Sequence, residues 1–184
     1  MRDYTPGIAY TRQGGDVTYS QLVTAGSGVG AGLELDSANA YTSGDVIQTG
    51  LLIFDNVYPE PNNCAIELHN LIINEYHAGA GNHKAMTLLL MNNPEDFVAT
   101  KNDAFSYSTN LVNQDIVARV NIYSTDYALL DTTHSRALIN LPNREIVKNS
   151  SNIVNLYGVL IAAGTVAPFG AGDTLELGLQ YAQS

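Results

Sequence analysis

The sequence has little of what most binding and catalytic sites are made from. Its 184 residues include one cysteine, no tryptophan and eight basic residues. The single cysteine, Cys64, excludes an intrachain disulfide and a set of cysteine ligands for a metal. The basic residues stand singly, whereas binding to a phosphate backbone needs clusters of lysine and arginine that release counterions. We therefore expect no nucleic-acid partner, and an anionic membrane surface is equally unfavourable.

Charged residues of both signs are few. They make up 14% of the chain, where about a quarter is usual. Eighteen acidic residues against eight basic ones give a formal charge of −10, and most of the polarity comes from Asn, Ser, Thr, Gln and Tyr. Such neutral polar side chains cost less to desolvate than Lys or Glu, so the composition favours β-structure and large contact surfaces.

Long apolar runs are also missing. No stretch approaches the roughly eighteen residues of a membrane-spanning helix, and the opening MRDYTPGIAYTRQGG contains no apolar run of signal-peptide length. We expect the protein to be made in a reducing cytoplasm and not to be addressed to a membrane. Asn149-Ser-Ser151 matches a glycosylation acceptor in form, and without a secretion signal it is interpreted as a turn.

What the sequence does contain is a series of short segments rich in Val, Ile, Leu, Thr and Tyr between turn residues. Leu175–Tyr181 alternates strictly between apolar and polar positions, which is typical of a strand with one wet face. Ile153–Ile161 is continuously apolar, which predicts a strand buried on both faces. Strands are predicted at 17–24, 31–36, 46–54, 65–75, 85–91, 115–124, 136–140, 153–162 and 174–181. This spacing predicts an all-β sandwich or barrel.

Little of the chain is predicted to be helical. Pro94 suits the first position of a short helix over 93–101, and Glu95 and Asp96 suit its first turn. Residues 126–130 are predicted to form a single turn. The first fifteen residues show no alternation, so we predict an extended N-terminal arm over 1–15, lying on a neighbouring molecule, and one β-sandwich domain over 16–184.

Motifs that would carry enzymatic chemistry are absent or have the wrong spacing. Gly26-Ser-Gly28-Val-Gly30-Ala-Gly32 places glycine at every second position, which fits neither of the common phosphate-binding loops, and no lysine follows it. The sequence has no G-x-S-x-G nucleophile elbow and no H-E-x-x-H zinc motif. A facing pair of carboxylates, as in a glycosidase, would have to come from positions that no spacing marks. We expect no enzymatic activity, no catalytic residues and no cofactor.

Histidines next to glutamates are the pattern that suggests a metal. Glu67 and His69, and likewise Glu75 and His77, would each share one face of a strand. Together with His83, the second pair could supply nitrogen and oxygen ligands. The alternative is that His77 and His83 flank a glycine-rich hairpin tip where polar side chains are simply hydrated. We predict no bound metal.

Tyrosine is unusually common, at eleven residues. Five of them fall in predicted loops or near predicted strand ends: Tyr4, Tyr10, Tyr19, Tyr41 and Tyr58. In such places a tyrosine offers an apolar ring with a polar tip, which suits protein–protein contact. Each is equally compatible with an ordinary half-buried loop position.

Several phrases, taken in order, carry a resemblance to a known family. They are Ser37-Ala-Asn-Ala-Tyr-Thr-Ser-Gly-Asp-Val-Ile47, Gly50-Leu-Leu-Ile-Phe54, Leu88-Leu-Leu-Met-Asn-Asn-Pro94 with Phe97, Asn102-Asp-Ala-Phe105, Leu156-Tyr-Gly-Val-Leu160, Thr165 through Pro168, and the strand Leu175 to Leu179. Their order resembles small virion proteins of tailed bacteriophages, which are head-decoration (cement) proteins or related structural subunits. The resemblance spans roughly Ala31 to the C-terminus.

The resemblance implies a jelly-roll-like β-sandwich subunit that is a homotrimer. It implies a place on the exterior of an icosahedral capsid, where the protein binds the major capsid protein and locks neighbouring capsomers together, after synthesis in the host cytoplasm. The family has no catalytic residues to carry over. A binder of this kind stabilises the shell by mass action and, as a trimer, by avidity.

Two surfaces are candidates for these contacts. Tyr4, Ile8, Tyr10 and Arg12 on the arm are the capsid-contact candidates, and they would become ordered on binding. Leu156, Tyr157 and Leu160 are the candidates for the oligomer interface, or they belong to the sandwich core.

Two other function classes stay open. A phage tail or receptor-binding component with a carbohydrate-binding module would use loop Tyr and Asn residues, although the absence of Trp counts against it. A sandwich hydrolase would need an acidic or histidine-bearing cleft.

Overall fold

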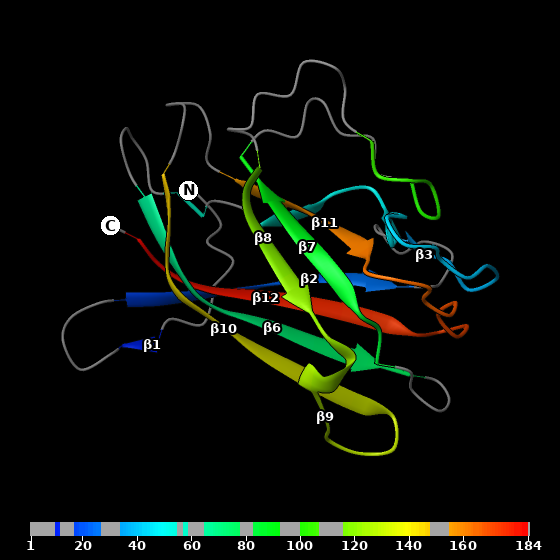
Figure 1. The fold of residues 1–184 in the computed structure, drawn as a ribbon. Helices are drawn as coiled ribbons and strands as arrows, with labels where there is room; N and C mark the ends of the chain where they lie inside the picture. Colours follow the sequence, from blue (N-terminus) through cyan, green and yellow to red (C-terminus); the bar gives the residue numbers. More distant parts are fainter. Residues whose placement is uncertain are drawn as a thin grey trace, which may run out of the picture.

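The computed structural model describes residues 10–11, 17–26, 34–54, 57–58, 65–77, 83–92, 100–106, 116–147 and 155–183. These residues form an all-β sandwich of two sheets, as predicted (Figure 1). The elements are β1 (Tyr10–Thr11), β2 (Val17–Gly26), β3 (Glu34–Leu35), β4 (Gln48–Thr49), β5 (Leu52–Phe54), β6 (Ala65–Tyr76), β7 (Met86–Met91), β8 (Ile116–Ile122), the 3-10 turn η1 (Ser124–Asp126), β9 (Tyr127–Leu129), β10 (His134–Val147), β11 (Leu156–Ala162) and β12 (Thr174–Gln183). None of the described residues forms a helix long and apolar enough to cross a membrane.

The two sheets differ in size. The large sheet has eight strands in the order β4-β3-β2-β12-β6-β10-β9, with β1 added beside β2. The small sheet has four strands in the order β5-β11-β7-β8, and its strands run across those of the large sheet (Figure 1). Among the described residues, every pairing of strands is antiparallel except that of β2 with β3. A sandwich of this kind buries the facing sides of its sheets against each other.

The alternating sequence of β12 explains its place in the middle of the large sheet. Leu175, Leu177 and Leu179 are fully buried against the small sheet, whereas Glu176 and Gln180 lie on the outer face. On that face Glu176 accepts a hydrogen bond from Asn74 at 3.2 Å. The predicted strand with one wet face is confirmed.

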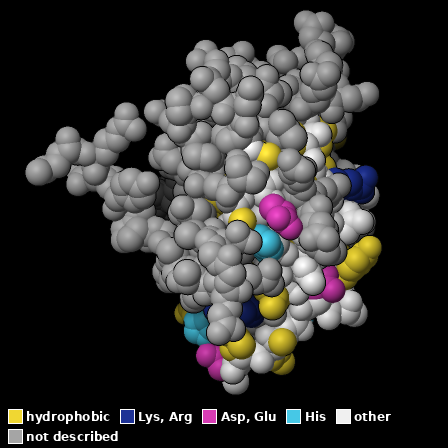
Figure 2. Space-filling view, turned by 90° about the vertical axis from the view of Figure 1, so that its left-hand side faces the viewer, with side chains coloured by type: hydrophobic (Ala, Val, Ile, Leu, Met, Phe, Trp, Pro, Cys, Tyr) yellow, Lys and Arg dark blue, Asp and Glu magenta, His cyan; other side chains and the backbone are white. Residues whose placement is uncertain are grey.

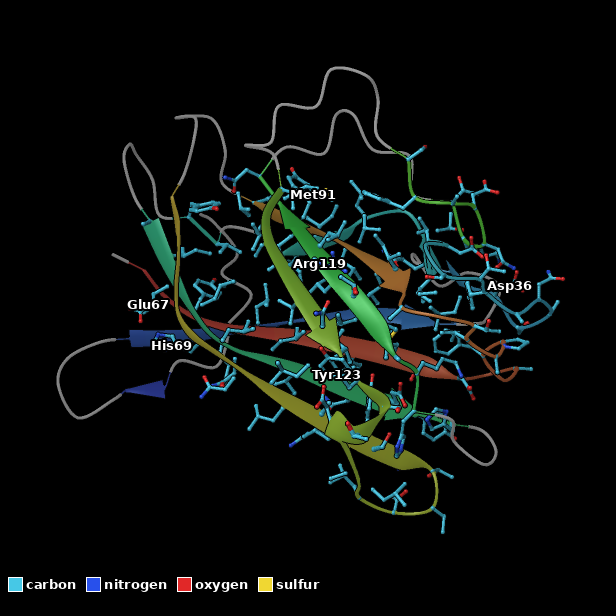
Figure 3. The ribbon with its side chains drawn as sticks, viewed as in Figure 1. Asp36, Glu67, His69, Met91, Arg119 and Tyr123 are labelled. Carbon is cyan, nitrogen blue, oxygen red and sulfur yellow. The ribbon has the colours of Figure 1, made fainter. Side chains whose placement is uncertain are left out.

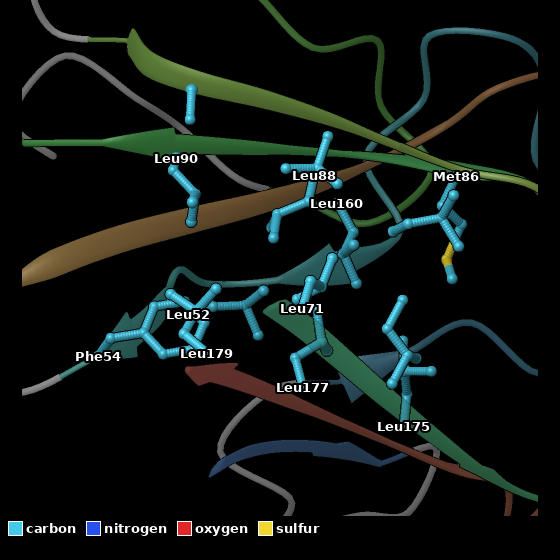
Figure 4. Packing of buried hydrophobic residues seen from close by; sticks show 14 of the residues in the cluster. Leu52, Phe54, Leu71, Met86, Leu88, Leu90, Leu160, Leu175, Leu177 and Leu179 are labelled. Atoms are coloured by element: carbon cyan, nitrogen blue, oxygen red, sulfur yellow. The ribbon is translucent and has the colours of Figure 1, made fainter. Parts of the chain in front are cut away.

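β11 is apolar along its whole length because side chains on both of its faces are covered. Leu156 and Leu160 face the large sheet, and Val159 faces the other way into a second small cluster with Val46 and Met91. Both faces of the strand are therefore covered, as predicted. The main core lies between the sheets, where leucines of β6 and β12 pack against leucines of β7 and β11 (Figure 4).

The segment predicted as one strand over 46–54 is two strands in different sheets. Gln48–Thr49 joins the large sheet and Leu52–Phe54 joins the small one. Gly50 lies between them with φ +81°, a left-handed conformation that glycine adopts without strain. The turn at Gly50 passes the chain from one sheet to the other, which a hydrophobic pattern alone does not indicate.

Other predicted elements also differ from the structure in their bounds or type. β10 runs from His134 to Val147, well beyond the predicted 136–140, although it contains Pro142. Proline is tolerated there because, among the described residues, β9 pairs only with residues 135–137 of β10 and a register shift follows Asn140. The predicted turn over 126–130 is wrong, since the 3-10 turn ends at Asp126 and β9 follows it. The predicted strand 31–36 is described only as β3, and most of the predicted helix 93–101 lies outside the described residues.

Candidate functional site

Buried charges gather at one end of the sandwich, where β6 ends and β12 begins. His77 follows β6, with its Nε2 3.0 Å from Glu75 Oε2 and its Nδ1 3.4 Å from Asp173 Oδ2. All three side chains are almost completely buried, with 1%, 4% and 5% exposure for Glu75, His77 and Asp173. A buried charge is expensive unless it is paired, so this imidazole between two carboxylates is a built feature of the fold.

A lysine from the other sheet completes this group. Lys84 immediately precedes the β7 region, is 4% exposed, and places its Nζ 4.5 Å from the centre of the Phe169 ring. Burial lowers the pKa of Lys84, while the charges of Glu75 and Asp173 oppose that shift. We call Glu75, His77, Lys84 and Asp173 the buried junction, because all four are buried beside strands of the two sheets.

Neighbouring polar groups surround the Glu75 side of the buried junction. Ser135 on β10 donates a hydrogen bond to Glu75 Oε2 at 3.4 Å. Burial, and after it the charge of Glu75, raises the pKa of Tyr127. By geometry, neither Glu75 Oε1 nor the Tyr127 hydroxyl has a hydrogen-bond partner among the described residues.

Within the described residues, His77 and His83 form neither the metal site nor the hydrated hairpin tip that the sequence suggested. His77 is buried, so the hydrated hairpin-tip interpretation is wrong for it; Asp173, distant in sequence, covers the ring. His83 stacks on Tyr127 with ring centroids 5.0 Å apart. The described residues hold no group of three or more His, Cys, Asp or Glu side chains arranged for a metal, and Cys64 lies outside them.

Glu67 and His69 lie farther along β6 (Figure 3). Both are partly exposed on either side of the fully buried Leu68, so they share the outer face of the strand as predicted. Figure 2 views the molecule from that end, and on its described part acidic side chains lie next to histidines, with basic side chains among them. This face therefore carries no described patch of one charge.

Two of the five tyrosines that the sequence placed in loops or near strand ends, Tyr41 and Tyr58, are buried and hydrogen-bonded within the chain. The Tyr41 hydroxyl accepts a hydrogen bond from the Asp36 N–H at 2.7 Å and donates one to the Ile47 carbonyl at 3.0 Å. Tyr58 is buried and donates to Asn92 Oδ1. The protein-contact interpretation is wrong for both, because each side chain is buried and its hydroxyl group makes hydrogen bonds within the chain.

An exposed apolar surface lies at the hairpin between β9 and β10. Leu129 and Leu130 are 71% and 59% exposed, and we call these two residues the hairpin patch. Tyr76 and Leu138 are also exposed, but they lie on the other face of the sheet from Leu129, which pairs with the inward-facing Ser135. Adjacent exposed leucines of this kind mark an interaction surface more often than scattered ones do.

Hydrogen bonds fix the tip of this hairpin. The carboxylate of Asp131 accepts the backbone N–H groups of Thr133 and His134, both at 2.7 Å, and the Thr133 hydroxyl at 3.0 Å. These two backbone hydrogen bonds lower the pKa of Asp131 to about 2. The leucines of the hairpin patch therefore stand on a rigid support.

A groove of about 480 Å³ crosses the outer face of the small sheet. Leu89 and Ile161 lie in its floor, and Arg119, Asn121 and the exposed Tyr123 lie along it (Figure 3). The lining thus combines an aromatic ring, an amide and a guanidinium with an apolar floor. It is a surface hollow of the size of ligand sites.

The contact residues predicted from sequence fall in three places. Tyr4, Ile8 and Arg12 lie outside the described residues, and Tyr10 lies in β1, which pairs with Thr18 of the same chain. Leu156 and Leu160 are fully buried in the core, where the chain's own large sheet accounts for their burial. Tyr157 faces the opposite side, part-buried against the Val46 cluster.

The sequence indicated the pair Glu75 and His77, but it did not indicate Lys84 and Asp173 of the buried junction, or the hairpin patch. Lys84 and Asp173 each stand just before an apolar strand, and a charge in that position is the signal that could have indicated burial. No protein-family model matches the chain, and a search of curated proteins found no similar sequence.

Proposed function

We propose that the protein is a structural protein of a tailed-phage virion, a capsid decoration (cement) protein that binds the outer capsid surface and stabilises neighbouring capsomers. The sequence resemblance from Ala31 onward supports this proposal. The observation that carries it is the hairpin patch, a pair of exposed leucines on a fixed hairpin.

The hairpin patch has the physical properties of a docking surface. Burying Leu129 and Leu130 against a partner would remove apolar area from water, at roughly 25 cal/mol per Å². Because Asp131 already fixes the hairpin tip, docking orders little additional chain, which favours affinity. The major capsid protein is the partner that this proposal assigns to the surface.

The rest of the molecule suits a subunit that is stable before it assembles. The core between the sheets is closed by the chain's own residues. A formal charge of −10 favours solubility before assembly. A jelly-roll-like homotrimer, as the resemblance implies, would present three hairpin patches to the lattice and gain by avidity.

Co-sedimentation with expanded, undecorated phage heads tests the proposal. We expect the wild-type protein to co-sediment and to raise the melting temperature of the heads, and Leu129→Asp/Leu130→Asp to lose at least tenfold in affinity. Ile53→Asp is the matched control, because Ile53 is an exposed apolar residue on β5 of the small sheet. A wild-type protein that stays in the supernatant at every head concentration would refute the function.

A second candidate function is carbohydrate binding at the groove of the small sheet. Tyr123 is 58% exposed and offers a ring on which a sugar could stack, beside the amide of Asn121 and the guanidinium of Arg119. In this case a glycan array would retain the protein, and Tyr123→Ala would abolish retention while leaving binding to phage heads unchanged.

A further inference from the structure

We propose that Lys84 and Asp173 become joined by an amide bond inside the folded protein, with Glu75 and His77 transferring the protons. The product would be a covalent link between the two sheets in a chain whose single cysteine excludes an intrachain disulfide. This inference is independent of the proposed function.

The topology places the reacting groups together from opposite layers. Lys84 leads into β7 of the small sheet, and Asp173 leads into β12 of the large sheet. Both side chains are buried. Lys84 Nζ lies 4.5 Å from the centre of the Phe169 ring, and Gly170, the residue after Phe169, donates its N–H to Asp173 Oδ2, so both side chains lie at the same turn. Proximity of this kind converts an unfavourable encounter in water into a reaction between fixed neighbours.

The carboxyl group of Asp173 is held as an acceptor. Its Oδ2 accepts the Gly170 N–H at 2.7 Å and lies 3.4 Å from His77 Nδ1. Donors of this kind stabilise the negative charge that develops on the oxygen when an amine adds to the carboxyl carbon. Gly170 permits the arrangement, since a Cβ at that position would stand 2.9 Å from Asp173 Oδ1.

The surroundings also favour the amine as a nucleophile. Burial lowers the pKa of Lys84 and so promotes the uncharged amine that attacks. Glu75 Oε1 is buried without a hydrogen-bond partner among the described residues, and the proposal assigns it as the first acceptor of a proton from Lys84. Glu75 Oε2 is 3.0 Å from His77 Nε2, and the ring leads on to Asp173. Glu75 and His77 therefore form a path for protons from the lysine side to the aspartate side.

The proposed reaction balances without a further reagent. Lys84 Nζ adds to Asp173 Cγ, and the new N–C bond is kept while the Cγ–Oδ2 bond breaks. The ammonium nitrogen loses two protons, which Glu75 and His77 pass to Oδ2, the oxygen that faces His77 Nδ1, so that Oδ2 leaves as water. One ammonium and one carboxylate become one amide and one water. A pocket of about 250 Å³ lined in part by His83 and Lys84 is the exit for this water.

Burial supplies the driving force. In water an ammonium and a carboxylate are more stable than the amide, because both ions are hydrated. Inside the protein that hydration is lost, and two buried ions retain a desolvation penalty that a neutral amide avoids. The reaction therefore replaces a costly buried ion pair with an uncharged covalent link.

Intact mass spectrometry of the denatured wild-type protein tests the inference. We expect a mass lower than the sequence mass by one water, and a tryptic digest in which cleavage after Lys84 is lost and a branched peptide joins Lys84 to Asp173. Fragmentation of that peptide identifies the acceptor. A full sequence mass with normal cleavage after Lys84 would overturn the proposal, as would a branch at Glu75.

Variants separate the chemistry from the fold. Lys84→Arg keeps the positive charge but cannot form the amide, and Asp173→Ala removes the acceptor, so both should show the full sequence mass. Glu75→Gln should slow the loss of water by at least tenfold in freshly purified protein, whereas Lys101→Met should leave it unchanged. Retention of the water loss in Lys84→Arg would overturn the assignment, and the wild-type digest decides the matter if a variant fails to fold.

Discussion

The buried junction and the hairpin patch are opposite exceptions to the usual distribution of polarity. In the buried junction four ionisable side chains lie where a sandwich normally places leucines, and in the hairpin patch leucines lie where it normally places charges. Both regions are closely held by hydrogen bonds, through His77 in one and Asp131 in the other. The comparison shows that where this chain buries charges or exposes leucines, hydrogen bonds hold those side chains or their loop in place. Exceptions of this kind to the usual distribution of polarity are where a functional site is expected.

Removing one charge from the buried junction should give the largest effect. Glu75→Ala leaves the buried His77 Nε2 without its carboxylate partner. We expect a loss of about 3–5 kcal/mol in the free energy of unfolding, as for other broken buried ion pairs. Urea denaturation measures it.

The matched control is Glu176→Ala, because Glu176 pairs with Asn74 on the outer face of β12. Its loss should stay within about 0.5 kcal/mol, as for ordinary surface substitutions. Equal losses for the two glutamates would remove the distinction between the buried junction and the rest of the sheet.

The hairpin leucines should behave in the opposite way. Leu129→Asp/Leu130→Asp removes side chains that make little use of the core, so the free energy of unfolding should change by no more than about 0.5 kcal/mol. Urea denaturation of the same variant that is tested against phage heads checks this. A loss of several kcal/mol would mean that the leucines support the fold and are not held ready for a partner.

Acid should affect the hairpin tip last and least. The folded-state pKa of Asp131 is about 2, below the unfolded value near 3.9, so its contribution to stability is present above about pH 4 and is lost as pH falls through about 2. The amide resonances of Thr133 and His134, followed by NMR against pH, should shift with a midpoint near 2. A midpoint near 4 would show that the carboxylate does not hold the tip. In Asp131→Asn these resonances should show no such titration.

Local sequence patterns were enough to predict most strands of the fold. The alternation of Leu175–Tyr181 and the apolar run ending at Ile161 each specify a strand and its environment from neighbouring residues alone. The break at Gly50 was missed because both halves of 46–54 are apolar, and only their partners differ. The end of β10 was missed because Pro142 is excluded from central strands but tolerated where the neighbouring strand stops.

The candidate sites depend on contacts between distant residues, so the sequence indicated them poorly. His77 and Asp173 are separated by 96 residues, and no local pattern around either residue indicates that the two are in contact. The hairpin patch was missed because Leu129 and Leu130 fall in 126–130, a segment predicted only as a single turn, and that prediction says nothing of their exposure. Exposure of a leucine depends on what the rest of the chain leaves uncovered, which a local pattern does not contain.

The position of β12 has a consequence for how the protein is made. This strand lies between β2 and β6, pairing Gly178 with Leu22 on one side and with Ile72 on the other. While a ribosome is still translating the codons before Thr174, β2 and β6 have no strand between them, and both present unpaired edges to other nascent chains. The large sheet therefore closes late, by insertion of a strand into its middle, and pauses in synthesis before residue 174 would be the moment of greatest risk of aggregation.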